Sequence, residues 1–176
     1  MPSRSLLLAL AAAFLSAGCR TMLHGHAPRG TATLHDASGR SIGVLNLEES
    51  GAGIRIVGDL SGLPSGVHGI HFHQTGRCDG PDFTTAGAHF NPFARKHGLE
   101  NPDGPHAGDM SNVRTSAQGA VFVEMLNPRV TLDDASTTVF DADGTAIVVH
   151  AAPDDQRTDP SGNSGARIAC GVITRR

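Results

Sequence analysis

One stretch of this chain carries most of its reactive side chains and almost none of its hydrophobic pattern. It runs from His68 to Asp109 and reads HGIHFHQTGRCDGPDFTTAGAHFNPFARKHGLENPDGPHAGD. Six of the ten histidines of the chain lie in it, together with a cysteine and several acids. A segment of this length without apolar periodicity needs something other than a hydrophobic core to order it. The density of imidazoles predicts that bound metal supplies that order.

Short segments of alternating apolar and polar residues surround this stretch and predict β-strands. The clearest cover residues 31–35, 41–47, 67–73, 120–125, 145–150 and 167–174, and shorter ones cover 54–56 and 138–140. The 22 glycines and the scarcity of aromatic residues favour a turn-rich β protein over a helical one. We therefore expect an all-β fold, an eight-stranded antiparallel Greek-key barrel or sandwich. Two long functional loops would interrupt it, the histidine-rich stretch and residues 151–165.

The first 18 residues have the pattern of a secretory signal peptide. Arg4 supplies a positive charge, and an apolar run over residues 6–15 follows that is too short for a membrane span. Small residues then precede Cys19, an ending that resembles a bacterial lipobox, and this predicts lipidation of Cys19. Ordinary cleavage nearby by the general signal peptidase is the alternative.

The leader also bears on where the protein acts. Residues 19–29 have no periodicity and predict a flexible tether, in which His24 and His26 could hold a metal weakly but are better explained as part of a polar linker. Arg20, rather than an aspartate, follows the cysteine and favours the outer membrane. We expect a periplasmic domain over residues 30–176, membrane-anchored through the lipid alone.

The three cysteines fit this compartment. If Cys19 carries the lipid, Cys78 and Cys170 remain as a pair in an oxidising environment, where a disulfide is expected. The bond would close a loop of about 90 residues, worth roughly 4–5 kcal/mol in the chain-entropy model. It would also tie the histidine-rich stretch to the last strand.

The spacing of the histidines indicates how they could converge. His71 and His73 alternate on a predicted strand, so their side chains share one face with roots about 7 Å apart. His150 ends an apolar strand, from which its ring could reach the pair. Along the loop, three histidines and a carboxylate suit a closed tetrahedral zinc site. These four are His89, His97, His106 and Asp109.

Six short motifs, in this order, carry a family resemblance. HFH, GAHFNP, RKHG, HAGD, VVHAAPDD and GNSGARIACGV closely resemble the copper/zinc superoxide dismutases, and the match covers most of the chain after Gly30. Loop lengths are similar to those of the bacterial periplasmic branch. The resemblance implies a Greek-key β fold, one copper and one zinc per subunit, and superoxide as the substrate. It allows a homodimer, although the subunit interface differs between branches.

The resemblance also implies a role for each matching residue. It makes four histidines the copper ligands, namely His71, His73, His89 and His150. It makes His89, His97, His106 and Asp109 the zinc ligands, so that His89 bridges the two metals. Four imidazoles suit Cu(II), and three imidazoles with a carboxylate suit Zn(II). Asp154 would accept hydrogen bonds from His71 and His97. Arg167 would dock the substrate anion, and Cys78 and Cys170 match the family's disulfide.

The expected activity is dismutation of superoxide to dioxygen and hydrogen peroxide at copper alternating between Cu(II) and Cu(I), protecting the cell envelope. The catalytic residues would be Arg167, as a fixed positive charge, and His89, as a proton donor. A net charge of −3 gives no reason to expect nucleic acid as a partner and requires any attraction of superoxide to be local. Arg95, Lys96 and Arg157 are candidates for that attraction.

Two alternatives to this enzyme remain. One is a non-catalytic envelope lipoprotein that binds copper and zinc, which the loss of a copper ligand or of the arginine would have favoured. The other is a surface lipoprotein with structural zinc and no copper, which would purify with zinc only.

Overall fold

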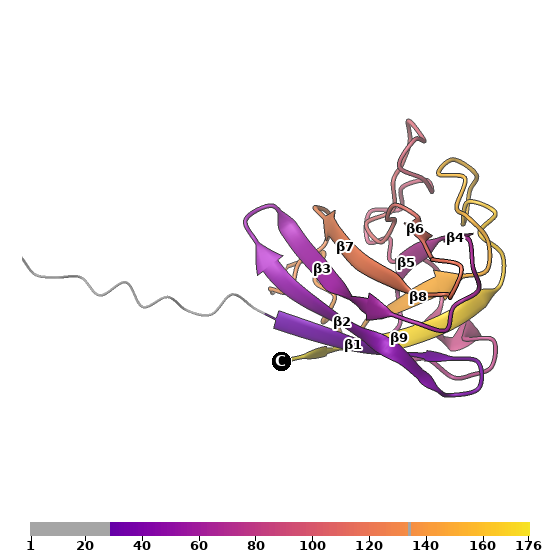
Figure 1. Cartoon of the computed structure of the whole chain (residues 1–176). Helices are drawn as coiled ribbons and strands as arrows, with labels where there is room; N and C mark the ends of the chain where they lie inside the picture. The colour runs from indigo at the N-terminus through magenta and orange to yellow at the C-terminus, as the bar shows by residue number, and fades with distance from the viewer. Residues whose placement is uncertain (1–28, 134) are drawn as a thin grey trace, which may run out of the picture.

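The fold is all-β, as predicted. A computed structural model describes residues 29–133 and 135–176 (Figure 1). The signal peptide, Cys19 and the tether histidines His24 and His26 lie outside these residues. The described strands are β1 (Arg29–Asp36), β2 (Ser41–Ser50), β3 (Gly53–Leu60), β4 (Val67–His68), β5 (Ile70–His73), β6 (Val113–Arg114), β7 (Val121–Asn127), β8 (Ala146–His150) and β9 (Arg167–Arg175), with one short 3-10 helix, η1 (Thr84–Ala86).

Seven strands form one curled antiparallel sheet in the order β5-β8-β9-β1-β2-β3-β7. Strands β4 and β6 form a separate antiparallel pair. The chain passes from β3, next to the edge strand β7, to β5 at the opposite edge, and it crosses again from β7 to β8. These crossings are consistent with the predicted Greek-key arrangement. Figure 1 shows the sheet curving around its inner face, with the two long loops rising together at one end.

Strand β2 shows how the apolar pattern produces the curved sheet. Ile42, Leu45 and Leu47 are all buried, although strict alternation would place Ile42 and Leu45 on opposite faces. The pairing of β1 with β2 shifts register between Leu34 and His35, where the partners change from Gly43 to Ser41. One extra residue in β2 therefore turns Ile42 back toward the core, as a β-bulge does.

Two sequence predictions differ from the structure. Residues 138–140 form no strand, because Thr138 makes only an isolated bridge with Thr131 while Val139 is fully buried. Their apolar character reflects a loop that closes the core. The predicted strand over 67–73 is split at Gly69, so that β4 pairs with β6 and β5 pairs with β8. Within the described residues, no helix is long and apolar enough to cross a membrane.

Candidate metal centre

Strand β5 is the platform of the site. Phe72 is fully buried in the main core, so its neighbours His71 and His73 both project from the opposite face of the strand. β5 pairs antiparallel with β8, and His150 ends that strand. Three of the expected copper ligands thus come from two adjacent strands of the sheet.

The loop ligands reach the platform through backbone pairing. His89 forms an isolated bridge with His73, and Asp109 forms one with His71. Between them, the Phe72 N–H donates to the carbonyl of Gly108 at 2.9 Å. Two loop segments therefore lie beside β5 as short strand-like partners. Main-chain bonds, which leave no trace in hydrophobic periodicity, help to order the long stretch.

Two groups of metal-binding side chains result, and both are buried. In each group the potential ligand atoms lie within 4.8 Å of one another. The first group is His71, His73, His89 and His150, and the second is His89, His97, His106 and Asp109. His89 belongs to both. The structure thus brings together each of the two sets that the sequence analysis proposed.

The hydrogen bonds of the first group leave one nitrogen of each ring available for a metal. His73 Nδ1 lies 2.9 Å from the carbonyl oxygen of Gly87, and His150 Nδ1 lies 3.2 Å from that of Gly165. An oxygen acceptor holds the proton on the nitrogen that faces it, so the other nitrogen carries a lone pair. These lone pairs converge, because His73 Nε2 and His150 Nε2 are 3.3 Å apart.

Unpartnered atoms point to the same conclusion. Among the described residues, His71 Nδ1 and His89 Nε2 are buried without a hydrogen-bond partner, and buried His106 Nδ1 has only a 3.3 Å contact with Asp109 Oδ1. Buried polar atoms are nearly always satisfied, so such a cluster indicates a binding site for a cation. His89 places Nδ1 2.9 Å from Asp109 Oδ1 in the second group, while its free Nε2 belongs to the first. The donor atoms fit copper in the first group and zinc in the second.

Burial keeps the rings of the first group neutral, which metal binding requires. Desolvation lowers the pKa of His150 to about 3 and that of His89 to about 4, and it lowers the pKa of His73 well below its ordinary value. His97 behaves differently. Burial opposes its charge, but hydrogen bonds to Asp109 and Asp154 raise its pKa to about 9. A metal bound to this ring would take the place of one of its protons.

Asp109 is the electrostatic centre of the second group. Burial alone would raise its pKa, but contacts with His106, His89 and His97 hold it well below its usual range. Its Oδ2 also accepts from the backbone N–H groups of Gly98 (2.8 Å) and His106 (2.9 Å). The carboxylate is therefore ionised and fixed in orientation. Such an anion favours a divalent cation at this position.

Asp154 links the two groups. Its Oδ2 lies 2.7 Å from His71 Nε2, and its Oδ1 lies 3.0 Å from His97 Nε2. The bond to His71 leaves Nδ1 of that ring free for a metal. Gly162 makes room for the carboxylate, because a Cβ at that position would lie 1.8 Å from Asp154 Oδ1. Gly162, the first residue of the GNSGARIACGV motif, is thus required because a side chain there would collide with the carboxylate that links the two groups.

Arg167 is anchored beside the first group. Its Nη1 donates to the carbonyl of Phe83, and its Nη2 donates to that of Gly87, each at 2.6 Å. The Gly87 carbonyl also faces His73 Nδ1, which links the guanidinium to a ring of the group. The predicted disulfide is present, since Cys78 and Cys170 are bonded across 92 residues. Phe83 packs in one small buried cluster with Cys170.

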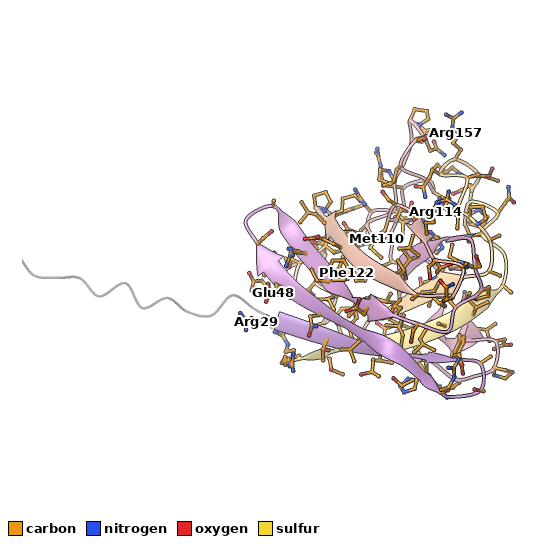
Figure 2. The ribbon with its side chains drawn as sticks, viewed as in Figure 1. Arg29, Glu48, Met110, Arg114, Phe122 and Arg157 are labelled. Atoms are coloured by element: carbon orange, nitrogen blue, oxygen red, sulfur yellow. A yellow bond between two sulfur atoms is a disulfide. The ribbon has the colours of Figure 1, made fainter. Side chains whose placement is uncertain are left out.

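The three residues suggested for attracting an anion make other contacts. Lys96 pairs with Asp159 at 2.9 Å, and Arg157 pairs with Glu100. Arg95 donates to the carbonyl of Gly104. Figure 2 shows Arg157 at the outer tip of the paired loops.

The surface depression at Arg167 does not include these three cations. It is lined by Asp82, Thr84, Gly165, Ala166 and Arg167. Arg95, Lys96 and Arg157 are absent from this lining, and its second charged residue is an acid, Asp82. No local sequence signal identified Asp82, Phe83 or Gly87, because their roles depend on loop geometry.

The remaining histidines of the described chain stand apart from the two groups. The two ring nitrogens of buried His68 lie 2.8 Å from the carbonyl oxygen of His150 and 2.9 Å from that of Pro64. His68 therefore has a structural role, supporting the strand end that carries His150. His35 is exposed on β1.

Comparison with known proteins agrees with this geometry. A family model described as copper/zinc superoxide dismutase (SODC) matches residues 41–173. The superoxide dismutase [Cu-Zn] 1 of Aquifex aeolicus (strain VF5) is 47% identical over 144 residues, which cover 81% of this chain and 85% of that protein. The superoxide dismutase [Cu-Zn] of Caulobacter vibrioides is 44% identical over 146 residues, 81% of this chain and 84% of that one.

Solved structures give the same result. The crystal structure of a SOD-like protein from Bacillus subtilis superposes with a TM-score of 0.78 at 38% identity, covering 84% of this chain and 97% of that one. Fold, buried histidine groups and sequence identity all agree. This chain belongs to the copper/zinc superoxide dismutase family.

Proposed function

We infer that this protein is an enzyme that dismutates superoxide to dioxygen and hydrogen peroxide. The observation that carries the inference is the position of His89, which offers one ring nitrogen to each of two buried metal-binding groups. A single imidazole between a four-histidine set and a histidine-carboxylate set suits a copper–zinc pair. We assign copper to His71, His73, His89 and His150, and zinc to His89, His97, His106 and Asp109.

Copper held by the four-histidine group would supply the one-electron chemistry of the reaction. The residues of the chain supply the rest. Carbonyl and carboxylate oxygens fix the tautomers of the copper-group rings. Arg167, held by two carbonyl oxygens, presents a fixed positive charge for the superoxide anion. His89 is placed to carry a proton on Nε2, the nitrogen without a hydrogen-bond partner among the described residues.

A non-catalytic copper/zinc-binding protein is the weaker alternative. It gains no support from the site, because the four-histidine group is complete and Arg167 lies beside it. A protein with structural zinc alone would not need four converging imidazoles.

The deciding experiment combines elemental analysis with a direct superoxide assay. Metal-free protein is reconstituted with copper and zinc, with zinc only, and with neither, and superoxide decay is followed by stopped-flow absorbance. We expect one copper and one zinc per chain, and rapid decay only in the copper-containing sample. A copper- and zinc-replete protein that does not exceed the zinc-only sample would contradict the enzymatic function.

We further propose that the enzyme acts in the periplasm, anchored to the outer membrane through a lipid on Cys19, and protects the envelope. Support comes from the sequence of residues 1–19, from Arg20, and from a disulfide suited to an oxidising compartment. Mass spectrometry of the mature N-terminus and fractionation of the full chain test this. Cys19→Ser should shift the protein from the membrane to the soluble fraction, and an unchanged distribution argues against the anchor.

A further inference from the structure

Asn112 lies three residues after Asp109, at the end of the segment that carries two of the assigned zinc ligands. Its side-chain amide makes two hydrogen bonds with the main chain of a single residue in the other long loop. Asn112 Nδ2 donates to the carbonyl of Asp154 at 2.8 Å, and the Asp154 N–H donates to Asn112 Oδ1 at 2.8 Å. Two bonds in opposite directions fix both the position and the rotation of that backbone.

The residue held in this way is the one that links the two metal groups. The side chain of Asp154 contacts His71 of the copper group and His97 of the zinc group, and the residue is 3% exposed. A displacement of its backbone would move both oxygens relative to the rings they orient. Distances of 2.7 and 3.0 Å leave little tolerance before these hydrogen bonds weaken.

Other contacts join the two loops without holding the backbone of Asp154 to the zinc segment. Gln156 Nε2 donates to the carbonyl of Met110 at 3.2 Å, and Lys96 pairs with Asp159. The two loops therefore have other contacts when Asn112 is replaced. The pair of hydrogen bonds between Asn112 and the backbone of Asp154 is a separate connection, which fixes the carboxylate that orients His71 and His97.

We propose that Asn112 is a positioning residue that couples the zinc group to the copper group. Zinc fixes the segment from His106 to Asp109, Asn112 transmits that order to the backbone of Asp154, and the carboxylate then orients the ring of His71. This route is distinct from the shared ligand His89. The proposal rests on the metal assignment made under the proposed function, but not on turnover of superoxide.

The test follows a ring proton that belongs to the copper group while only zinc is bound. In copper-free protein, exchange of the His71 Nε2–H with solvent, measured by NMR, reports its bond to Asp154. Saturating zinc should slow this exchange at least about tenfold in the unsubstituted protein. In Asn112→Ala at saturating zinc we expect less than about threefold slowing. We also expect zinc affinity to fall about tenfold, as when other outer partners of metal ligands are removed.

A matched control is available in the histidine-rich stretch. Asn91 makes an equivalent pair of bonds with the backbone of Arg95, at 2.9 and 3.0 Å, and does not contact Asp154. Asn91→Ala should retain the zinc-dependent slowing at His71. If Asn91→Ala loses the response as Asn112→Ala does, general loosening of the loop explains the result and the proposal is wrong.

Two further results would also overturn it. These are slowing in Asn112→Ala equal to that of the unsubstituted protein, and no slowing by zinc in the unsubstituted protein. Should the alanine variant fail to fold, Asn112→Asp carries the same test. It keeps an acceptor for the Asp154 N–H but removes the donor to the Asp154 carbonyl, so the response should again be reduced. Because no superoxide is used, an inactive protein with intact coupling would count against the proposed function alone.

Discussion

Arg167 donates a hydrogen bond from Nη1 to the carbonyl oxygen of Phe83, a residue 84 positions earlier, at 2.6 Å. Phe83 is buried, and its φ of 55° lies in the left-handed region that side-chain-bearing residues rarely adopt. Packing with Cys170 in a small apolar cluster holds this conformation. The placement of the proposed anion-docking charge thus depends on apolar packing beneath the loop.

Replacing this arginine should separate substrate attraction from metal binding. Arg167→Ala removes the fixed charge without touching a metal-binding nitrogen, so we expect kcat/KM for superoxide to fall at least about tenfold at unchanged copper and zinc content. Stopped-flow decay with elemental analysis measures both. Arg114→Ala, an exposed arginine on β6, serves as the control. Equal rates for Arg167→Ala and the unsubstituted protein would refute the assigned role.

The charge of Asp82 should lower kcat/KM for superoxide. It is the acid that lines the depression at Arg167, and its interaction with the guanidinium lowers the net positive potential there. Asp82→Asn keeps an oxygen for the Thr84 contacts but removes the charge, so kcat/KM should rise roughly twofold at low ionic strength and the gain should vanish at high salt. Asp79→Asn, whose carboxylate already pairs with Arg77, is the control. A rate unaffected by Asp82→Asn at low salt contradicts this account.

Removing the carboxylate between the two groups should weaken zinc binding. Asp154→Ala leaves the Nε2 atoms of His71 and His97 without their acceptor, and we expect zinc affinity to fall about 10- to 100-fold. Competition with a chromogenic chelator measures the affinity. The adjacent Asp155→Asn, at an exposed residue that contacts neither ring, should retain zinc normally. Equal zinc affinity in Asp154→Ala would show that the ligands orient themselves.

The disulfide should contribute to stability through the loop it closes. The disulfide joins residues that are 92 positions apart and so restricts the unfolded chain. When both Cys78 and Cys170 are replaced by alanine, we expect the free energy of unfolding to drop by roughly 2–5 kcal/mol. Urea denaturation of the metal-free proteins gives the difference. A second expectation is lower activity at full metal loading, because Phe83 and Gly87, which follow Cys78, accept the hydrogen bonds that hold Arg167. A variant as stable as the parent would contradict the first expectation.

The short alternating runs of the sequence predicted an all-β fold, and the membership of both metal groups was implied by the family resemblance together with the spacing of the histidines. Alternation in short runs predicts strands, and His71 and His73 share a strand face because of backbone geometry. The 138–140 segment misled the prediction, because an apolar loop that closes a core has the same composition as a strand. The positions of His89 and Asp109 beside β5 were not predictable from pattern, since backbone pairing does not depend on side-chain type.

The tertiary structure determines how the metal-binding side chains are held and oriented. The oxygen partners that set the ring tautomers come from Gly87, Gly165 and Asp154, which are far apart in the sequence. Asn112 contacts Asp154, and Asp82 lies near Arg167, only because the fold brings distant parts of the chain together. Periodicity shows which side chains of one strand or helix are buried. These contacts instead join residues that lie far apart in the sequence, so no local pattern indicates them. The sequence thus determined which atoms could bind the metals, and the fold determined their orientation and charge environment.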